Sequence, residues 1–123
     1  MDAKIYEIFP LDIQLDKDQS TASLEIKEHM MNQYGIVHGG VITLFADTLM
    51  GEHAKQFYDD HTAVVTGQMN TYFINPAQSS SLYAEAHFIK KGRSNIVIEC
   101  SVFADEKKVT HFNAIFHPVS KLN

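Results

Sequence analysis

A carboxylate inside an apolar stretch is the first residue of this chain whose position suggests chemistry. Asp47 lies near the middle of the segment 41–50, whose other residues are mostly apolar. If this segment is a helix, the residues three and four positions away carry no positive charge, so no ion pair within the helix offsets the cost of burying the carboxylate. Two interpretations stay open: Asp47 belongs to a reactive site, or it lies on a narrow solvated stripe with Thr43 and Glu52.

A histidine and two glycines, His38, Gly39 and Gly40, precede this segment. Glycines at a helix start leave backbone N–H groups open at the positive end of the helix dipole, where they can bind an oxyanion or a polarised carbonyl. A glycine pair is more commonly a tight turn, and His38 can equally serve as a helix cap or a packed side chain. The residues alone do not decide between these roles.

Asp47 and the glycine turn are too far apart along one helix to act on the same substrate atom. Asp47 lies nine residues beyond His38, which in a helix corresponds to a rise of ~13.5 Å and a rotation of ~900°. A two-fold dimer with antiparallel central helices would bring Asp47 of one subunit toward the glycine turn of the other. If both features are catalytic, the spacing predicts a site shared between subunits.

Hydrophobic periodicity predicts the elements that must hold these residues. Apolar residues cover most of the helical wheel from 41 onward, which indicates a helix buried on most sides. Residues 2–9 form a short helical or irregular lead-in, and 11–27 form two alternating pieces around a polar turn. Further strands are expected over 62–74, 81–90, 95–104 and 109–117. The last three should pair as a meander, which predicts an α+β fold with an antiparallel sheet wrapped around one long central helix.

Length and composition are those of one domain spanning residues 1–123. The chain is 45% hydrophobic and 20% charged, and its formal net charge of −5 argues against nucleic acid as a partner. Cys100 is the only cysteine, and its alternation with apolar neighbours predicts an inward-facing side chain. We expect a cytoplasmic protein that does not act in a membrane, since no signal peptide or apolar span is apparent.

The candidate residues form part of a longer motif, which reads Asn32-x-x-Gly35-x-x-His38-Gly39-Gly40 and continues with Asp47 and with MNTYFINPA at 69–77. This motif resembles that of the hotdog-fold acyl-CoA thioesterases of the PaaI type, which include phenylacetyl-CoA and 4-hydroxybenzoyl-CoA thioesterases. The resemblance covers about residues 20–117. It implies a hotdog fold, a homodimer that often pairs further into a homotetramer, and active sites at the dimer interface.

The resemblance also implies roles for single residues in hydrolysing an acyl-CoA to the free acid and coenzyme A. Asp47 would activate water or attack the thioester, while Asn32 and the Gly39 N–H would polarise its carbonyl. His38 would lie nearby, and Thr66 would help to place the water. A thioester has a good leaving group, so this chemistry needs no metal and no cofactor beyond the coenzyme A of the substrate.

Further residues are candidates for contacts with the substrate. Aromatic and apolar residues would build the acyl pocket, and basic residues at a hairpin would receive the phosphates of coenzyme A. Such a basic cluster is more often only a solvated turn. The candidates are Gly40, Phe57, Met69, Tyr72, Lys90, Lys91 and Arg93.

Other functions remain open on the same residues. A hotdog hydratase or dehydratase typically pairs a histidine with an acidic residue, in a motif that this sequence lacks. A non-catalytic acyl-CoA sensor would bind the ligand without turnover, and such regulators usually carry an added DNA-binding segment. A metal site is not expected, because the residue four before His53 is Leu49 and the pair Glu52-His53 is therefore not part of an HExxH motif.

Overall fold

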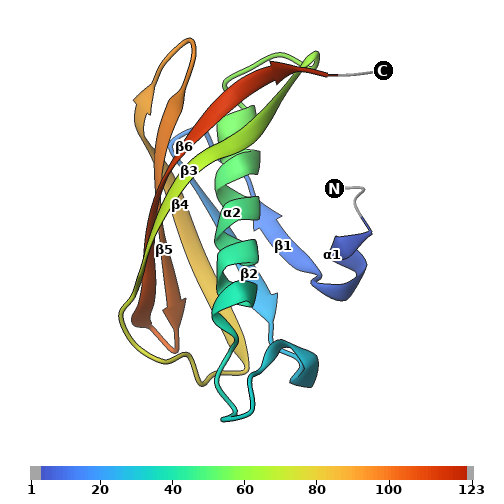
Figure 1. Cartoon of the computed structure of the whole chain (residues 1–123), viewed down its shortest axis with the longest axis vertical. Coiled ribbons are helices and arrows are strands. Elements are labelled where there is room, and N and C mark those ends of the chain that lie inside the picture. Colours follow the sequence, from blue (N-terminus) through green and yellow to red (C-terminus); the bar gives the residue numbers. More distant parts are fainter. Residues whose placement is uncertain (1–3, 122–123) are drawn as a thin grey trace.

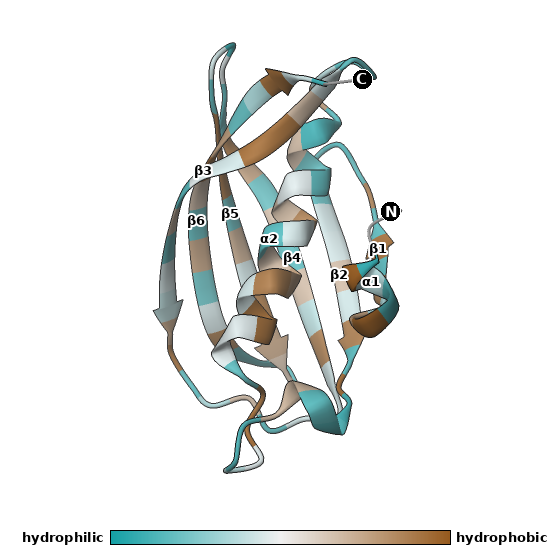
Figure 2. Cartoon of the chain, turned by 45° about the vertical axis from the view of Figure 1, so that its right-hand side comes forward, coloured by the Kyte–Doolittle hydropathy of each residue, from teal (hydrophilic) through white to brown (hydrophobic). Residues whose placement is uncertain are grey.

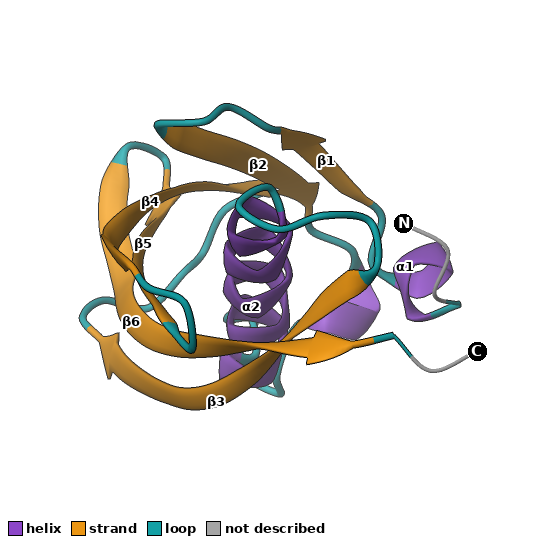
Figure 3. Ribbon diagram, turned by 90° about the horizontal axis from the view of Figure 1, so that it is seen from above, coloured by secondary structure: helices purple, strands orange, loops and turns teal. Residues whose placement is uncertain are grey.

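An antiparallel sheet curls around one long helix (Figure 1, Figure 3). The computed structural model describes residues 4–121. Its helices are α1 (Ile5–Ile8) and α2 (Gly39–Lys55), with a 3-10 turn η1 (Glu28–Met30) between them. Its strands are β1 (Leu11–Gln14), β2 (Gln19–Glu25), β3 (Thr62–Phe73), β4 (Ser81–Lys91), β5 (Ile96–Ala104) and β6 (Lys107–Ser120). The six strands follow the order β1-β2-β4-β5-β6-β3, which confirms the predicted α+β architecture and the meander of the last three strands.

The alternation seen in the sequence turns one face of each central strand toward α2. In β5, every second residue from Ile96 to Ala104 is buried, and the residues between them are only partly covered. Cys100 takes one of the inward positions, as predicted, and burial raises the pKa of its thiol to about 12. Figure 2 shows the resulting bands of apolar and polar residues along the strands.

Helix α2 is buried over most of its surface, as its all-round apolar character predicts. Phe45 and Leu49 are fully buried between the helix and the sheet. One stripe stays half-exposed, and it consists of Gly39, Thr43, Leu44, Asp47, Gly51 and Glu52. Asp47 therefore does lie on a stripe with Thr43 and Glu52, but this stripe also carries apolar Leu44 and two glycines. Among residues 4–121, no helix has the length and apolar character needed to cross a membrane.

Strand β6 continues through Pro118, although the sequence predicted an end before this residue. Pro118 pairs with Val64 of β3. It lies beyond Phe116, the last β6 residue that pairs with β5. The missing N–H of the proline is therefore not needed for a second ladder, which is why the strand can include it.

Strand β3 forms one edge of the sheet and pairs only with β6 among residues 4–121. It is 12 residues long and mostly exposed or half-exposed on both faces. The side chains of Val65, Tyr72 and Phe73 are 46%, 59% and 59% exposed. A long edge strand with exposed apolar side chains is a template for pairing with another chain.

Candidate active site

The carboxylate of Asp47 meets a hydroxyl group of the edge strand. Thr66 Oγ1, on β3, donates a 2.6 Å hydrogen bond to Asp47 Oδ1. Both residues line a hollow of about 340 Å³, here called the Asp47 hollow, which Tyr6 of α1 and Glu52 of α2 also line. Among residues 4–121 the Asp47 carboxylate takes part in no ion pair. The carboxylate is thus held by a neutral donor beside open space.

The start of α2 is capped by the side chain of His38. Its Nδ1 accepts a 2.8 Å hydrogen bond from the Gly40 N–H. A neutral His38 therefore carries its proton on Nε2. The Gly40 N–H is occupied by this cap, whereas the Gly39 N–H makes no hydrogen bond within the described part of the chain. Of the two glycine N–H groups, that of Gly39 is the one left to bind a carbonyl oxygen.

Asn32 holds the loop that leads to the helix. Its Oδ1 accepts hydrogen bonds from the backbone N–H groups of Tyr34 and Ile36, at 2.9 and 3.1 Å. The turn between them passes through Gly35, whose φ of 74° favours glycine. Since the amide oxygen is used in this turn, the Asn32 Nδ2 group is left as the donor that can reach a ligand.

Asn32 and Gly39 line a second hollow of about 310 Å³, here called the Gly39 hollow. Phe73, at the end of β3, forms another part of its wall. A Cβ atom built on Gly39 would lie 3.3 Å from the Phe73 ring, so the ring lies directly against the helix start. A side chain at position 39 would therefore require the Phe73 ring to shift by a few tenths of an ångström.

The carboxylate and the two donors occupy different hollows of one chain. No residue lines both the Asp47 hollow and the Gly39 hollow. Asp47 lies eight positions beyond Gly39 on α2, a rise of ~12 Å. The structure brings Asp47 together with Thr66, and Gly39 together with Asn32, but it does not bring the two pairs together within one subunit.

Of the three basic hairpin residues predicted to contact coenzyme A, only Lys91 lines a hollow of the structure. Lys91 lines a third hollow of about 580 Å³ at the C-terminal end of α2, here called the Phe57 hollow. Its Nζ lies 5.8 Å from the ring centroid of Phe57, which lines the same hollow. Lys90 and Arg93 are exposed and do not line it.

Two residues predicted to contact the acyl group lie on opposite faces of β3. Met69 is half-buried and packs against the core. Tyr72 pairs with His111 on the face turned away from α2. It lines none of the three hollows. Tyr6 and Phe88, which do line hollows, were missed because they carry no motif and the fold alone brings them there.

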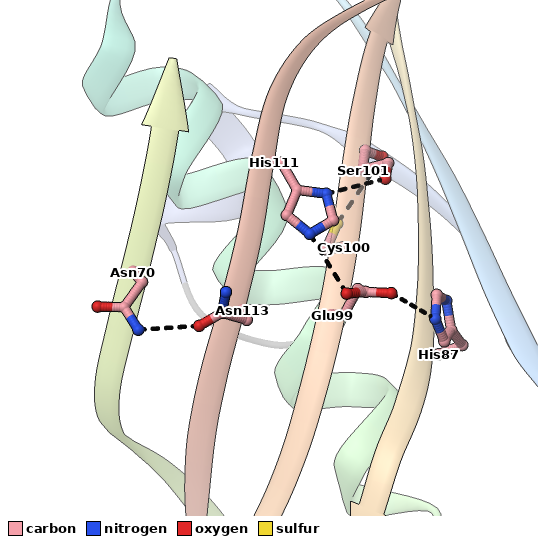
Figure 4. A network of polar contacts seen from close by, with 7 residues as sticks. All are labelled: Asn70, His87, Glu99, Cys100, Ser101, His111 and Asn113. Carbon is pink, nitrogen blue, oxygen red and sulfur yellow. Dashed lines mark hydrogen bonds and ion pairs between the residues drawn. The ribbon is translucent and has the colours of Figure 1, made fainter. Parts of the chain in front are cut away.

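A separate polar network covers the outer face of the sheet (Figure 4). Glu99 of β5 lies within ion-pair distance of two histidines: its Oε1 is 2.8 Å from His87 Nε2, and its Oε2 is 3.3 Å from His111 Nε2. The other His111 nitrogen, Nδ1, lies 3.4 Å from Ser101 Oγ. Within residues 4–121 no group of histidine, cysteine and acidic side chains is arranged to hold a metal ion. This network lies across the sheet from Asp47 and ties β4, β5 and β6 together.

A sequence profile of the thioesterase superfamily matches residues 34–111, more than half of the chain. The chain belongs to this superfamily. It is 28% identical over 87 residues to a Saccharolobus solfataricus protein named "Putative esterase SSO2140", a match that covers 71% of this chain and 61% of that protein. The chain thus spans less than two thirds of the length of this relative.

Solved structures share the fold over nearly the whole chain. Thioesterase HI1161 from Haemophilus influenzae superposes with a TM-score of 0.90 at 20% identity, covering 99% of this chain and 87% of that chain. BH2602 from Bacillus halodurans, solved with CoA, gives 0.89 at 24% identity and covers 98% and 81%. These similarities confirm the hotdog fold that the motif predicted.

Proposed function

We propose that this protein hydrolyses acyl-CoA thioesters at a site formed by two copies of the chain. The observation that carries the proposal is the division of one chain into two half-sites. The Asp47 hollow holds a carboxylate and a hydroxyl group, and the Gly39 hollow holds two N–H donors. Thioester hydrolysis requires both a group that activates the nucleophile and donors that polarise the carbonyl. The relative solved with CoA supports coenzyme A as the leaving group.

The chemistry of each half-site fits a role in this reaction. The Gly39 N–H and Asn32 Nδ2 would donate to the thioester oxygen, which gains negative charge in the transition state. Asp47 from the other subunit would take a proton from water or attack the carbonyl carbon itself. Thr66 would hold the carboxylate in place. His38 would act indirectly, by capping Gly40 and so fixing the backbone at Gly39.

A homodimer through the β3 edge would join the half-sites. The unpaired edge of β3 and its exposed Val65 and Phe73 support pairing with a second copy of the same strand. Two antiparallel copies of α2 would then lie side by side, with Asp47 of each near Gly39 of the other. Thr66 and Phe73, one from each half-site, belong to this same strand.

The direct test uses purified protein, a panel of acyl-CoAs and a dye that traps free thiol. Wild type should release thiol, and Asp47→Asn should lower kcat by ~10²–10⁴-fold while the protein stays folded. Asp12→Asn is the matched control, because Asp12 is an exposed carboxylate on β1, at the other edge of the sheet. Tight acyl-CoA binding without thiol release by wild type would contradict the proposal and favour a sensor.

A further inference from the structure

The Phe57 hollow is the largest of the three and differs in chemistry from the other two. Its walls include three aromatic side chains, from Phe57, Tyr58 and Phe88. Lysines from three separate segments also line it: Lys17 from the β1–β2 turn, Lys55 from the end of α2 and Lys91 from β4. Flat apolar walls combined with ammonium groups suit a ligand that joins a planar ring to an anion.

The lysines of this hollow are not engaged by acidic partners. No ion pair among residues 4–121 includes Lys17, Lys55 or Lys91. Lys91 Nζ instead lies over aromatic rings, 5.1 Å from the Phe88 centroid and 5.8 Å from that of Phe57.

Three acidic residues, Glu52, Asp59 and Asp60, also line the hollow. The Asp59 Oδ1 is turned to its own loop, where it accepts hydrogen bonds from the His61 N–H and from Thr62 Oγ1, both at 2.9 Å. Glu52 lies at the border with the Asp47 hollow. Of the charged side chains that line the hollow, Lys91 is the one that lies over the aromatic rings.

The aromatic wall of the hollow packs against a buried residue, His53, on its inner side. His53 is fully buried, and its ring lies 4.2 Å from the Phe88 ring, centroid to centroid. His53 Nδ1 lies 2.6 Å from Ser20 Oγ and 3.1 Å from Gln56 Nε2. Because Gln56 itself lines the hollow, these contacts hold two of its walls in place before any ligand binds.

The Phe57 hollow adjoins the Asp47 hollow, since Glu52 and Lys55 line both. Lys55 lies eight positions beyond Asp47 on α2, a rise of ~12 Å. A ligand with one end at the Asp47 carboxylate can therefore extend along α2 into the aromatic and cationic space, provided that a flexible arm of about this length joins its two ends.

We propose that the Phe57 hollow binds the adenosine phosphate end of coenzyme A. The adenine would lie against Phe57 and Phe88, and Lys17, Lys55 and Lys91 would pair with phosphate groups, while the pantetheine arm crosses to Asp47. This inference rests on the proposed function. It also gives the two neighbouring lysines of the hairpin different roles, because Lys91 would contact the ligand and Lys90 would not.

Two substrates with the same acyl group test this assignment, one an acyl-CoA and the other an acyl-pantetheine that lacks the nucleotide. Lys91→Ala should lower kcat/KM for the acyl-CoA by about tenfold to a hundredfold, since it removes a charged contact. The same variant should leave the acyl-pantetheine rate unchanged. Lys90→Ala is the matched control and should affect neither substrate. Adenosine 3′,5′-bisphosphate should bind wild type in calorimetry and bind Lys91→Ala more weakly.

Other results would overturn the assignment. An equal loss for both substrates in Lys91→Ala would do so, as would an equal effect of Lys90→Ala on acyl-CoA. Failure of the bisphosphate to bind wild type would contradict it directly, whether or not the protein has thioesterase activity. The variant Phe57→Ala tests whether the acyl group occupies the hollow in place of the nucleotide. A changed preference for acyl chain length, with unchanged bisphosphate binding, would assign the hollow to the acyl group. If wild type hydrolyses neither thioester but binds the bisphosphate, the proposed reaction fails and the nucleotide site stands.

Discussion

Thr66 of the edge strand holds Asp47 of the central helix through a 2.6 Å hydrogen bond from its hydroxyl group to the carboxylate. The two residues lie 19 positions apart in the sequence, and a bulge follows Thr66 directly in β3. Because β3 is also an edge strand of the sheet, this bond links the candidate nucleophile or base to the strand on which a second subunit would dock.

The first prediction concerns this bond. Thr66→Val removes the hydroxyl group and keeps the shape, so the carboxylate loses its donor and its fixed orientation. We expect kcat to fall by about tenfold to a hundredfold, the range expected for a hydrogen bond to a charged group. Thr66→Ser keeps the hydroxyl and should retain most of the activity. Equal rates for the valine and serine variants would show that the bond has no part in turnover.

The second prediction concerns Gly39. In Gly39→Ala the new methyl group would lie 3.3 Å from the Phe73 ring, so the ring must shift within the hollow that holds the donors. We expect thermal stability to be unchanged or slightly higher, since alanine favours helices, and turnover to fall about tenfold. The double variant Gly39→Ala, Phe73→Leu frees the space and should regain activity. If the single variant were as active as wild type, the Gly39 amide would not be close to the reacting carbonyl.

The third prediction concerns the β3 edge. A charged side chain in place of Val65, which is 46% exposed, should oppose pairing with a second copy. We expect Val65→Lys to sediment as a smaller species than wild type and to lose thioesterase activity in parallel. Tyr83→Lys, an exposed position on the central strand β4, is the control and should keep the wild-type assembly. A Val65→Lys protein that is monomeric and fully active would rule out a shared site.

The fourth prediction concerns pH and the buried His53. Burial, followed by the charges of His87 and Lys91, lowers the pKa of His53 below its usual 6.5, and Asp16 only partly opposes this shift. The unfolded chain therefore binds a proton more readily than the folded chain. The stability that neutral His53 provides is fully present above pH 6.5 and is lost as the pH falls through 6.5 toward the lowered pKa.

Urea unfolding at a series of pH values tests this sign. The His53→Gln variant should lose less stability than wild type between about pH 7 and pH 5, because glutamine does not titrate. Gln33→Ala is the control, because it replaces an exposed residue that does not titrate, and it should follow the wild-type curve. A His53→Gln curve that parallels wild type over this interval would contradict a buried neutral imidazole.

The fold could be predicted from the sequence because its signals are local. The alternation in β5 and the all-round apolar character of α2 each reflect burial on a definite face, and both are confirmed. The end of β6 was predicted wrongly because a proline usually ends a strand. Here Pro118 lies past the last residue of β6 that pairs with β5, which no local pattern can indicate.

The candidate site could be predicted only in part. The spacing of Gly39 and Asp47 was enough to show that one chain cannot join them. The residues that act with Gly39 and Asp47 could be predicted only from the resemblance to the family motif. A contact such as that of Asp47 with Thr66 depends on how β3 crosses the helix, which spacing along the chain does not show. Phe57 and Lys91 were among the predicted substrate contacts, but the hollow that they share was not predicted, because its lysines come from three segments that only the fold assembles.

A mixed-subunit experiment tests the shared site most directly. Asp47→Asn and Asn32→Ala should each be inactive alone, and the two chains can be co-expressed with different tags and purified as a mixed dimer. One of its two sites would combine the intact Asp47 of one chain with the intact Asn32 of the other, so we predict about half of the wild-type thiol release per dimer. A mixed dimer as inactive as its parents would contradict a site built from Asp47 and Asn32 of different subunits.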